Sequence, residues 1–250
     1  MTVLVGVLCE DGVVLGSDSS GTIAGGNIRT IEQPLEKTFI VGDDVIFAGT
    51  GQVGLGQRFK AILEELRRRP DFDFAHQDPL IIAMNICANA VNNFAFTHAP
   101  KGEFGALVAF TSRSEFHLCE FAVRDFQPEF KTRDMWFVSM GSGQPITDPL
   151  LGLLRRVFFK GSCPRLNEGV FAVAWALAHA IELNTGGIQG PPQIGVLARD
   201  APDGPFQARL LTDEELAEHD GNVHGVETHL AAYRELLSGG GEKPIPDLDT

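Results

Sequence analysis

The sequence predicts a mixed α and β protein of the α+β class. Its first fifty residues hold two pairs of short apolar runs, and an acidic turn joins the members of each pair. Such pairs are typical of antiparallel strands connected by hairpins. Further along, stretches such as residues 79–96 repeat apolar side chains at helical spacing. With 250 residues, of which 44% are hydrophobic, the chain is long enough to bury a large core.

The first predicted hairpin begins at the N-terminus. Residues 2–9 form an apolar, β-branched run, and residues 13–18 form a second one. Glu10, Asp11 and Gly12 lie between them and supply a turn. Because no basic segment precedes the first run and two acidic residues interrupt the apolar stretch, we predict a buried strand here and no signal peptide.

A second predicted hairpin joins residues 37–41 to residues 45–49 through Gly42, Asp43 and Asp44. The segment from Gly49 to Gly54 then leads into a helix. The remaining elements follow from apolar periodicity and from turn residues. They are helices over 57–69, 79–96, 148–159, 169–183, 213–219 and 226–237, and strands over 104–111, 115–121, 135–140, 194–198 and 207–211. We expect one domain over residues 1–237 and a flexible tail over 238–250, which is rich in glycine and proline.

Composition limits the function classes. The net charge of −13 disfavours binding to nucleic acid or to an anionic membrane surface, and no apolar run approaches the roughly 20 residues that span a bilayer. The cysteines are far apart, as expected for free thiols in a reducing cytoplasm: Cys9, Cys87, Cys119 and Cys163. The scattered histidines offer no metal-ligand set, so we expect neither a metal nor a cofactor.

Thr2 is the strongest chemical candidate because it follows Met1 directly. Removal of Met1 would place a hydroxyl and a free α-amine on one residue, which is a nucleophile with its own general base. The α-amine has a reference pKa of about 7.7–8.0, so a useful fraction is neutral near pH 7. An inert terminus is the alternative interpretation.

Asp18 and Lys37 suit the same chemistry. A cation near Thr2 would favour the neutral amine and would stabilise charge that develops during attack. A buried lysine needs a partner, and Asp18 at the end of a predicted strand is available. A structural ion pair at a strand end is the alternative. Gly49 ends another predicted strand, and its backbone N–H could serve a substrate that approaches closely.

This arrangement resembles the proteasome β-subunit family of N-terminal-nucleophile hydrolases. Thr2 matches the family's nucleophile, Asp18 its catalytic aspartate and Lys37 its catalytic lysine. Ala48-Gly49 matches the glycine whose amide forms the oxyanion hole. The resemblance is strongest over residues 2–60 and extends to about residue 200.

The later part of the resemblance departs from the family pattern in places. Ser142 matches the family's serine-glycine turn, and Glu182 and Thr185 match its acidic-residue and Ser-Gly-Gly segment. The family usually has aspartate where this chain has Glu182. The spacing between Asp18 and Lys37 is also longer than usual, and a glycine-rich insertion could lie between them.

The resemblance implies a fold and a substrate. The fold is a four-layer αββα sandwich with two stacked, mainly antiparallel sheets. A peptide or an unfolded protein chain would bind as an added strand along Gly21, Thr22 and the segment 49–51, including Gly51. Phe47 matches the floor of the first specificity pocket, where it would favour small side chains; a place in the hydrophobic core is the alternative.

The resemblance further implies a cytoplasmic homo-oligomeric ring and an ATP-dependent unfoldase as a partner. Two other functions stay open. One is a catalytically silent ring subunit that keeps the fold for assembly. The other is a dinucleotide-binding oxidoreductase, because Gly49 to Gly54 reads G-x-G-x-x-G between a strand and a helix.

Overall fold

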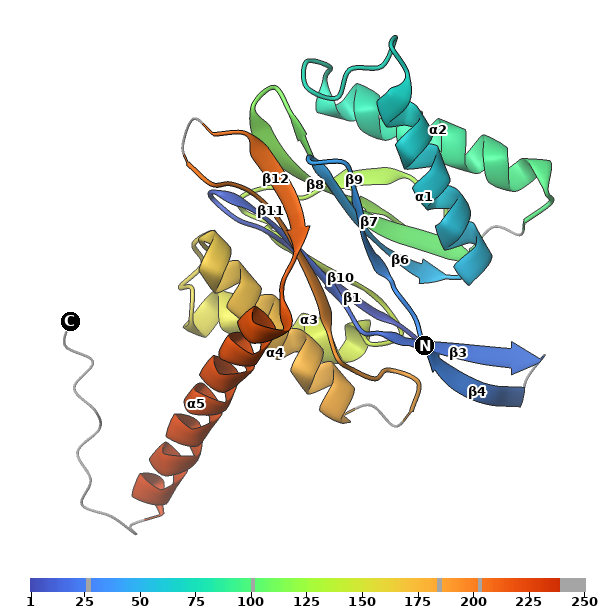
Figure 1. Cartoon of the computed structure of the whole chain (residues 1–250). Helices are drawn as coiled ribbons and strands as arrows, with labels where there is room; N and C mark the ends of the chain where they lie inside the picture. The colour runs from blue at the N-terminus through green and yellow to red at the C-terminus, as the bar shows by residue number, and fades with distance from the viewer. Residues whose placement is uncertain (26–27, 100–101, 184–185, 202–203, 239–250) are drawn as a thin grey trace.

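The computed structural model describes residues 1–25, 28–99, 102–183, 186–201 and 204–238. Within these residues, two five-stranded sheets face each other, and helices cover both outer faces (Figure 1). The predicted α+β class and the four-layer arrangement are confirmed. The buried apolar side chains accordingly form two clusters, one that covers both faces of the first sheet and one beneath α1 and α2.

The first sheet has the strand order β10-β1-β2-β11-β12, with antiparallel neighbours throughout. Its strands are β1 (Val3–Leu8), β2 (Gly12–Ser17), β10 (Phe137–Gly141), β11 (Gln193–Arg199) and β12 (Phe206–Leu210). Strands β1 and β2 are buried along their whole length, as their unbroken apolar runs predict. Their register pairs Leu4 with Ser17, so the start of β1 and the end of β2 meet at one edge of the sandwich.

The second sheet has the order β5-β6-β7-β8-β9. Its strands are β5 (Thr38–Val41), β6 (Val45–Gly51), β7 (Phe104–Ser112), β8 (Glu115–Phe121) and the short β9 (Pro128–Phe130), which the sequence did not indicate. Strand β6 pairs antiparallel with both β5 and β7. The glycine fingerprint after β6 therefore does not open a parallel βαβ unit, and the dinucleotide-binding alternative is wrong.

Helices α1 (Val53–Arg68) and α2 (Pro79–Phe96) cover the second sheet, and α3 (Gln144–Val157) and α4 (Leu166–Leu183) cover the first (Figure 1). Helix α2 begins as predicted: the Asp78 side chain accepts a hydrogen bond from Leu80 N, and Pro79 occupies the first turn. By length and composition α2 could cross a membrane, with a mean hydropathy of 1.3. In this fold its buried face, which includes Ile82 and Ile86, packs against the second sheet, so length and composition are weak support for a span.

Two regions differ from the sequence prediction. The expected glycine-rich insertion contains a hairpin of β3 (Ser20–Gly25) and β4 (Ile28–Pro34), which projects from the sandwich near the N-terminus (Figure 1). The two expected C-terminal helices are one helix, α5 (Asp213–Leu237). Gly221 and Gly225 lie between the two expected helices, but each costs only about 1 kcal/mol relative to alanine within a helix, and the helix continues through both.

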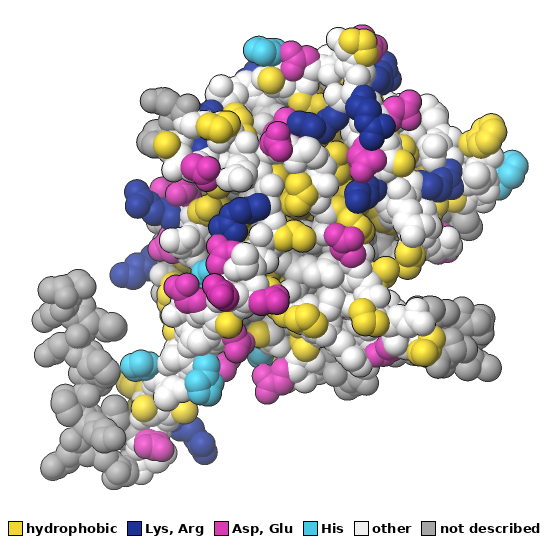
Figure 2. Space-filling view, in the orientation of Figure 1, with side chains coloured by type: hydrophobic (Ala, Val, Ile, Leu, Met, Phe, Trp, Pro, Cys, Tyr) yellow, Lys and Arg dark blue, Asp and Glu magenta, His cyan; other side chains and the backbone are white. Residues whose placement is uncertain are grey.

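Helix α5 packs its first half on α4 and then extends away from the sandwich (Figure 1). Its first turn contains Asp213, Glu214 and Glu215, and acidic side chains gather where the helix begins (Figure 2). Negative charge at this end suits the helix dipole. Of the predicted tail, residues 239–250 lie outside the described residues.

Candidate active site

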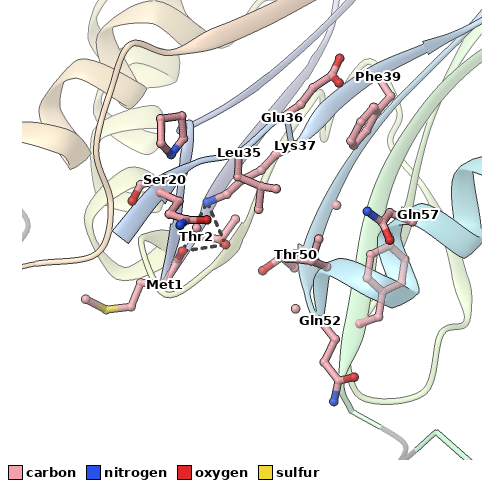
Figure 3. A pocket seen from close by; sticks show the side chains of 18 residues that line it. Met1, Thr2, Ser20, Leu35, Glu36, Lys37, Phe39, Thr50, Gln52 and Gln57 are labelled. Atoms are coloured by element: carbon pink, nitrogen blue, oxygen red, sulfur yellow. Dashed lines mark hydrogen bonds between the residues drawn. The ribbon is translucent and has the colours of Figure 1, made fainter. Parts of the chain in front are cut away.

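A cavity of about 570 Å³ opens at the edge where β1 begins. It lies between the start of β3, the segment before β5, the end of β6 and the first turns of α1 (Figure 3). Thr2, Lys37, Gly49, Gly21 and Gly51 are among its lining residues. The fold thus brings most of the predicted site residues to one place, from segments far apart in the sequence.

Lys37 lies at the centre of the polar contacts in this cavity. Its Nζ is 2.8 Å from both carboxylate oxygens of Asp18 and 3.2 Å from Thr2 Oγ1. The side chains of Lys37 and Asp18 are 4% and 0% exposed. A buried cation in contact with the hydroxyl of Thr2 is the arrangement that stabilises an alkoxide-like oxygen.

Backbone amides hold Asp18 in place. Its Oδ1 accepts a hydrogen bond from Val3 N at 3.0 Å, and its Oδ2 accepts one from Ser20 N at 3.3 Å. Two strands and the turn into β3 therefore fix the carboxylate. A carboxylate held in this way positions the lysine ammonium, since the ammonium can satisfy its charge only where the two oxygens point.

Burial lowers the pKa of Lys37 below its ordinary value, and the adjacent Asp18 carboxylate opposes this effect. Loss of water around the ammonium disfavours its charged form, whereas the carboxylate favours it. The lysine will therefore lose its proton at a lower pH than a lysine in water.

Met1 occupies the place where the chemistry would occur. Thr2 Oγ1 donates to the Met1 carbonyl oxygen at 2.8 Å, and Lys37 Nζ donates to the same oxygen at 3.3 Å (Figure 3). While Met1 is attached, the Thr2 nitrogen is an amide and cannot act as a base. The Thr2 chemistry consequently requires removal of Met1.

Ser142 contacts the main chain of Thr2 from the turn after β10. Its hydroxyl accepts a hydrogen bond from Thr2 N at 3.0 Å and donates to Thr2 O at 3.3 Å. Gly141 lets the turn approach this closely in two ways. Its φ of 92° is a conformation that glycine adopts easily, and a Cβ at this position would meet the Thr2 carbonyl. Ser142 would thus lie beside the α-amine once Met1 is removed.

The backbone amide of Gly49 is not free, although the predicted oxyanion role requires it to be. Its amide donates to the Lys37 carbonyl at 3.0 Å, next to the β5–β6 ladder. An N–H held in this way is not an open donor to a substrate oxygen, so the oxyanion role predicted for Gly49 would need this bond to be shared or broken.

Glu182 does not join the cluster. Glu182 is exposed at the end of α4 and lines a separate hollow between α4 and α5. Thr185 lies outside the described residues. Of the later residues implied by the resemblance, Ser142 is brought to Thr2 and the described Glu182 is not.

The specificity pocket also differs from expectation. Phe47 is fully buried, with its ring 4.9 Å from that of Phe39 and 5.3 Å from that of Phe59. It belongs to the core beneath α1, which is the alternative that the sequence left open. The apolar wall of the cavity includes Phe104, together with Leu35 and Phe39, which are labelled in Figure 3. Thr22 lies in β3, paired with Glu32.

Gln193 is a positioning residue that the sequence did not indicate. Its Oε1 accepts hydrogen bonds from Lys37 N at 2.8 Å and Thr38 N at 3.2 Å, and its Nε2 donates to Leu35 O at 3.1 Å. The amide of one β11 side chain therefore fixes the segment that carries Lys37. An isolated glutamine at a strand start has no sequence signal for this role.

Among the described residues, no group of three His, Cys, Asp or Glu side chains could hold a metal ion. The polar groups that converge at Thr2 are a hydroxyl, an ammonium, a carboxylate and a second hydroxyl. This set can activate an oxygen nucleophile by proton transfer and charge stabilisation.

Comparison with known proteins agrees with this geometry. A family model described as "Proteasome subunit" matches residues 2–156, more than half of the chain. No curated protein sequence matches at a significant level.

Solved structures of similar fold include several proteins called Anbu. The helical assembly of the Anbu complex from Pseudomonas aeruginosa has a TM-score of 0.70 at 16% identity, over 97% of this chain and 98% of that one. Anbu (ancestral beta-subunit) from Yersinia bercovieri has a TM-score of 0.62 at 15% identity, over 92% and 97%. Anbu from Hyphomicrobium sp. strain MC1 has a TM-score of 0.66 at 17% identity, over 99% and 100%.

Proposed function

This chain belongs to the proteasome subunit family, and we propose that it is an N-terminal threonine peptidase. The observation that carries the proposal is the position of Lys37 Nζ, within hydrogen-bonding distance of both Thr2 Oγ1 and Asp18 at the edge of a cavity. A hydroxyl in contact with a buried ammonium, one residue from the chain start, matches the needs of a nucleophile that uses its own α-amine as base.

The reaction begins after Met1 is removed. Thr2 Oγ1 bonds to the carbonyl carbon of the peptide, the carbonyl π electrons move onto oxygen, and the hydroxyl proton passes to the Thr2 α-amine. When the carbonyl re-forms, its bond to nitrogen breaks and the leaving amine takes the proton from the α-ammonium. An ester on Thr2 remains. Water then attacks this ester with the α-amine as base, and Thr2 Oγ1 leaves with a proton as the acid product departs.

The neighbours of Thr2 have separate roles in this proposal. The Lys37 ammonium lowers the energy of the developing negative charge on Thr2 Oγ1 and disfavours a second positive charge on the α-amine. Asp18 holds that ammonium in position. Ser142 Oγ, which now bonds Thr2 N, would orient the free amine.

We propose an extended peptide as the substrate. The cavity is lined by main chain at Gly21 on one side and at Gly49 and Gly51 on the other. A chain laid between these edges could form main-chain hydrogen bonds as an added strand, which requires an unfolded or extended substrate. The apolar wall around Phe39 favours an apolar side chain at the cleaved bond.

We also propose that the chain acts as a cytoplasmic homo-oligomer. The Pseudomonas relative is described as a helical assembly, and a contact that joins unlike surfaces produces either a closed ring or an open helix. The cysteines are free thiols, which suits a reducing compartment. Light scattering tests the oligomer, and a monomer that cleaves peptides would contradict it. Capture of an ATP-dependent unfoldase on the purified assembly would test that partner.

A catalytically silent subunit is the second candidate, and the Gly49 amide favours it because that amide is already hydrogen-bonded. The deciding experiment compares wild-type protein with Thr2→Ala and Thr2→Ser, each with the N-terminal residue determined by intact mass. We expect turnover of fluorogenic peptides by wild-type protein that lacks Met1, reduced turnover by Thr2→Ser and none by Thr2→Ala. Equal rates in wild-type and Thr2→Ala proteins would refute the peptidase.

A further inference from the structure

The proposed peptidase needs a hydrogen-bond donor for the oxyanion that forms when Thr2 attacks a carbonyl. The glycine amide expected in this role, Gly49 N–H, donates to the Lys37 carbonyl at 3.0 Å. The Lys37 ammonium is bonded to Asp18 and to Thr2 Oγ1 itself. An additional donor would therefore have to come from another group that faces Thr2.

Strand β6 presents such a group. Side chains alternate between the two faces of a strand. On β6, Phe47 belongs to the core beneath α1 and α2, and Ala48 belongs to the core between the two sheets. Thr50 shares the face of Ala48. Its side chain is thus directed toward the first sheet, at the edge where β1 begins.

The Thr50 hydroxyl lies close to Thr2. Thr50 lines the cavity and is 8% exposed. A Cβ placed on Gly141 would meet the Thr2 carbonyl and would lie 3.3 Å from Thr50 Oγ1, so both groups border the same small space. Figure 3 shows the Thr50 side chain reaching toward Thr2 from the side opposite Ser20.

This hydroxyl is also available. Over the described part of the chain, no hydrogen bond engages Thr50 Oγ1, whereas the buried strand hydroxyls of Ser17 and Thr38 are paired with each other at 2.8 Å. The hydroxyl faces the cavity, so its hydrogen can turn toward a group that is bound there. An oxygen that becomes negatively charged beside it would satisfy the donor.

We propose that Thr50 is a catalytic residue whose Oγ1–H donates a hydrogen bond to the oxyanion of the tetrahedral intermediate on Thr2. No proton is transferred: the hydroxyl hydrogen stays on Thr50 while the charge develops and collapses. The inference rests on the proposed peptidase function. It assigns the oxyanion site to a side chain on the inner face of β6, beside the Gly49 amide.

The test compares Thr50→Val, which removes the hydroxyl but keeps the shape, with Thr50→Ser, which keeps the hydroxyl. Loss of one oxyanion donor typically lowers kcat by about 10²–10³-fold. We expect a fall of this size in Thr50→Val with KM little changed, and most of the rate retained in Thr50→Ser. Thr111→Val is the matched control. Thr111 is a buried strand threonine in β7, at the end opposite Gly105, the residue that pairs with Thr50. We expect the kcat of Thr111→Val to equal that of wild type.

Binding of a peptide aldehyde provides a second measurement that does not depend on turnover. The aldehyde forms a hemiacetal with Thr2 Oγ1 that mimics the intermediate, whereas a peptide amide of the same sequence mimics only the substrate. Thr50→Val should weaken the aldehyde and leave the amide unchanged. Equal weakening of both ligands, or a wild-type kcat in Thr50→Val, would overturn the assignment of Thr50. If wild-type turnover is absent or persists in Thr2→Ala, the peptidase itself is refuted, and this inference falls with it.

Discussion

The layer between the two sheets differs in chemistry from the layer beneath α1 and α2. Beneath the helices, the core is rich in phenylalanine, and the ring of Phe59 contacts those of both Phe47 and Phe121. The core that includes the layer between the sheets, and that continues beneath α3 and α4, is mostly Val, Leu and Ala, and between the sheets it ends at the buried polar groups around Asp18 and Lys37. Strand β6 contributes one face to each layer. The aromatic layer stabilises the second sheet, and the other layer positions the candidate site at its edge.

This contrast explains why the buried ion pair is present. Taking two charges out of water often costs more free energy than their attraction returns, so a buried pair is weak support for a stabilising role. Aromatic side chains bury large areas and stabilise without that cost. We infer that Asp18 and Lys37 are retained for their position beside Thr2, which leads to predictions that separate stability from activity.

The largest effect is expected for Lys37→Met. Loss of the cation should abolish peptide turnover, and the unpaired Asp18 should destabilise the fold by about 3–5 kcal/mol in urea unfolding. Adding Asp18→Asn should restore most of the stability and none of the activity. A double variant that stays as unstable as the single one would show that the pair stabilises the fold in its own right.

A comparable loss of stability, without loss of chemistry, is expected for Phe47→Ala. Truncation of a fully buried phenylalanine costs about 3–5 kcal/mol. Because Phe47 does not line the cavity, the folded fraction should keep its kcat and its peptide preference at low temperature. Phe39→Ala should do the reverse, with a smaller stability loss and an altered preference for the side chain at the cleaved bond. A changed substrate preference in Phe47→Ala but not in Phe39→Ala would show that Phe47, and not Phe39, contacts the side chain at the cleaved bond.

A smaller effect is expected for Gln193→Ala. It removes the acceptor of the Lys37 and Thr38 amides and should cost about 1–3 kcal/mol, as for other buried groups left unsatisfied. The displaced Lys37 should lower kcat more than it raises KM. Unchanged kinetics would mean that β5 holds Lys37 without Gln193.

The smallest effect is a displacement of the pH profile. Activity should rise as the Thr2 α-amine becomes neutral, and because the Lys37 ammonium disfavours a second positive charge, this rise should occur below the reference pKa of about 7.7–8.0. It should then fall as Lys37 loses its proton, and because burial lowers the Lys37 pKa, this fall should occur below the value of about 10.4 found for lysine in water. Values of kcat/KM measured from pH 6 to 11 would show both the rise and the fall. A plateau that extends past the ordinary lysine pKa would show that the charge of Lys37 is not required.

The early strands and the candidate nucleophile could be predicted because their signals are local. Apolar runs with acidic turns specify β1, β2, β5 and β6, and Thr2 is marked by its place after Met1. The β3–β4 hairpin was missed because its glycines resemble a loop. Gln193 was missed because its bond to Lys37 joins residues 156 positions apart, and no periodic pattern encodes such a contact.

The roles of residues on one strand were harder to assign than the strand itself. Phe47, Gly49 and Thr50 lie together in a sequence that predicts β6 well. Which face of β6 meets Thr2 depends on how the sheets stack, and that arrangement is set by the whole core. The sequence therefore predicted β6 but left Phe47 open between the cavity and the core, and it did not single out Thr50.

The most direct test of the account is the site at which an electrophile reacts. Wild-type protein and Lys37→Met, both lacking Met1, would be exposed to a peptide β-lactone, which acylates a nucleophilic hydroxyl, and the modified peptide would be identified by mass spectrometry. We predict one adduct on Thr2 in wild-type protein and none in Lys37→Met. An adduct on Thr2 of equal yield in both proteins, or no adduct on Thr2 in either, would contradict the claim that Lys37 activates Thr2 as the nucleophile.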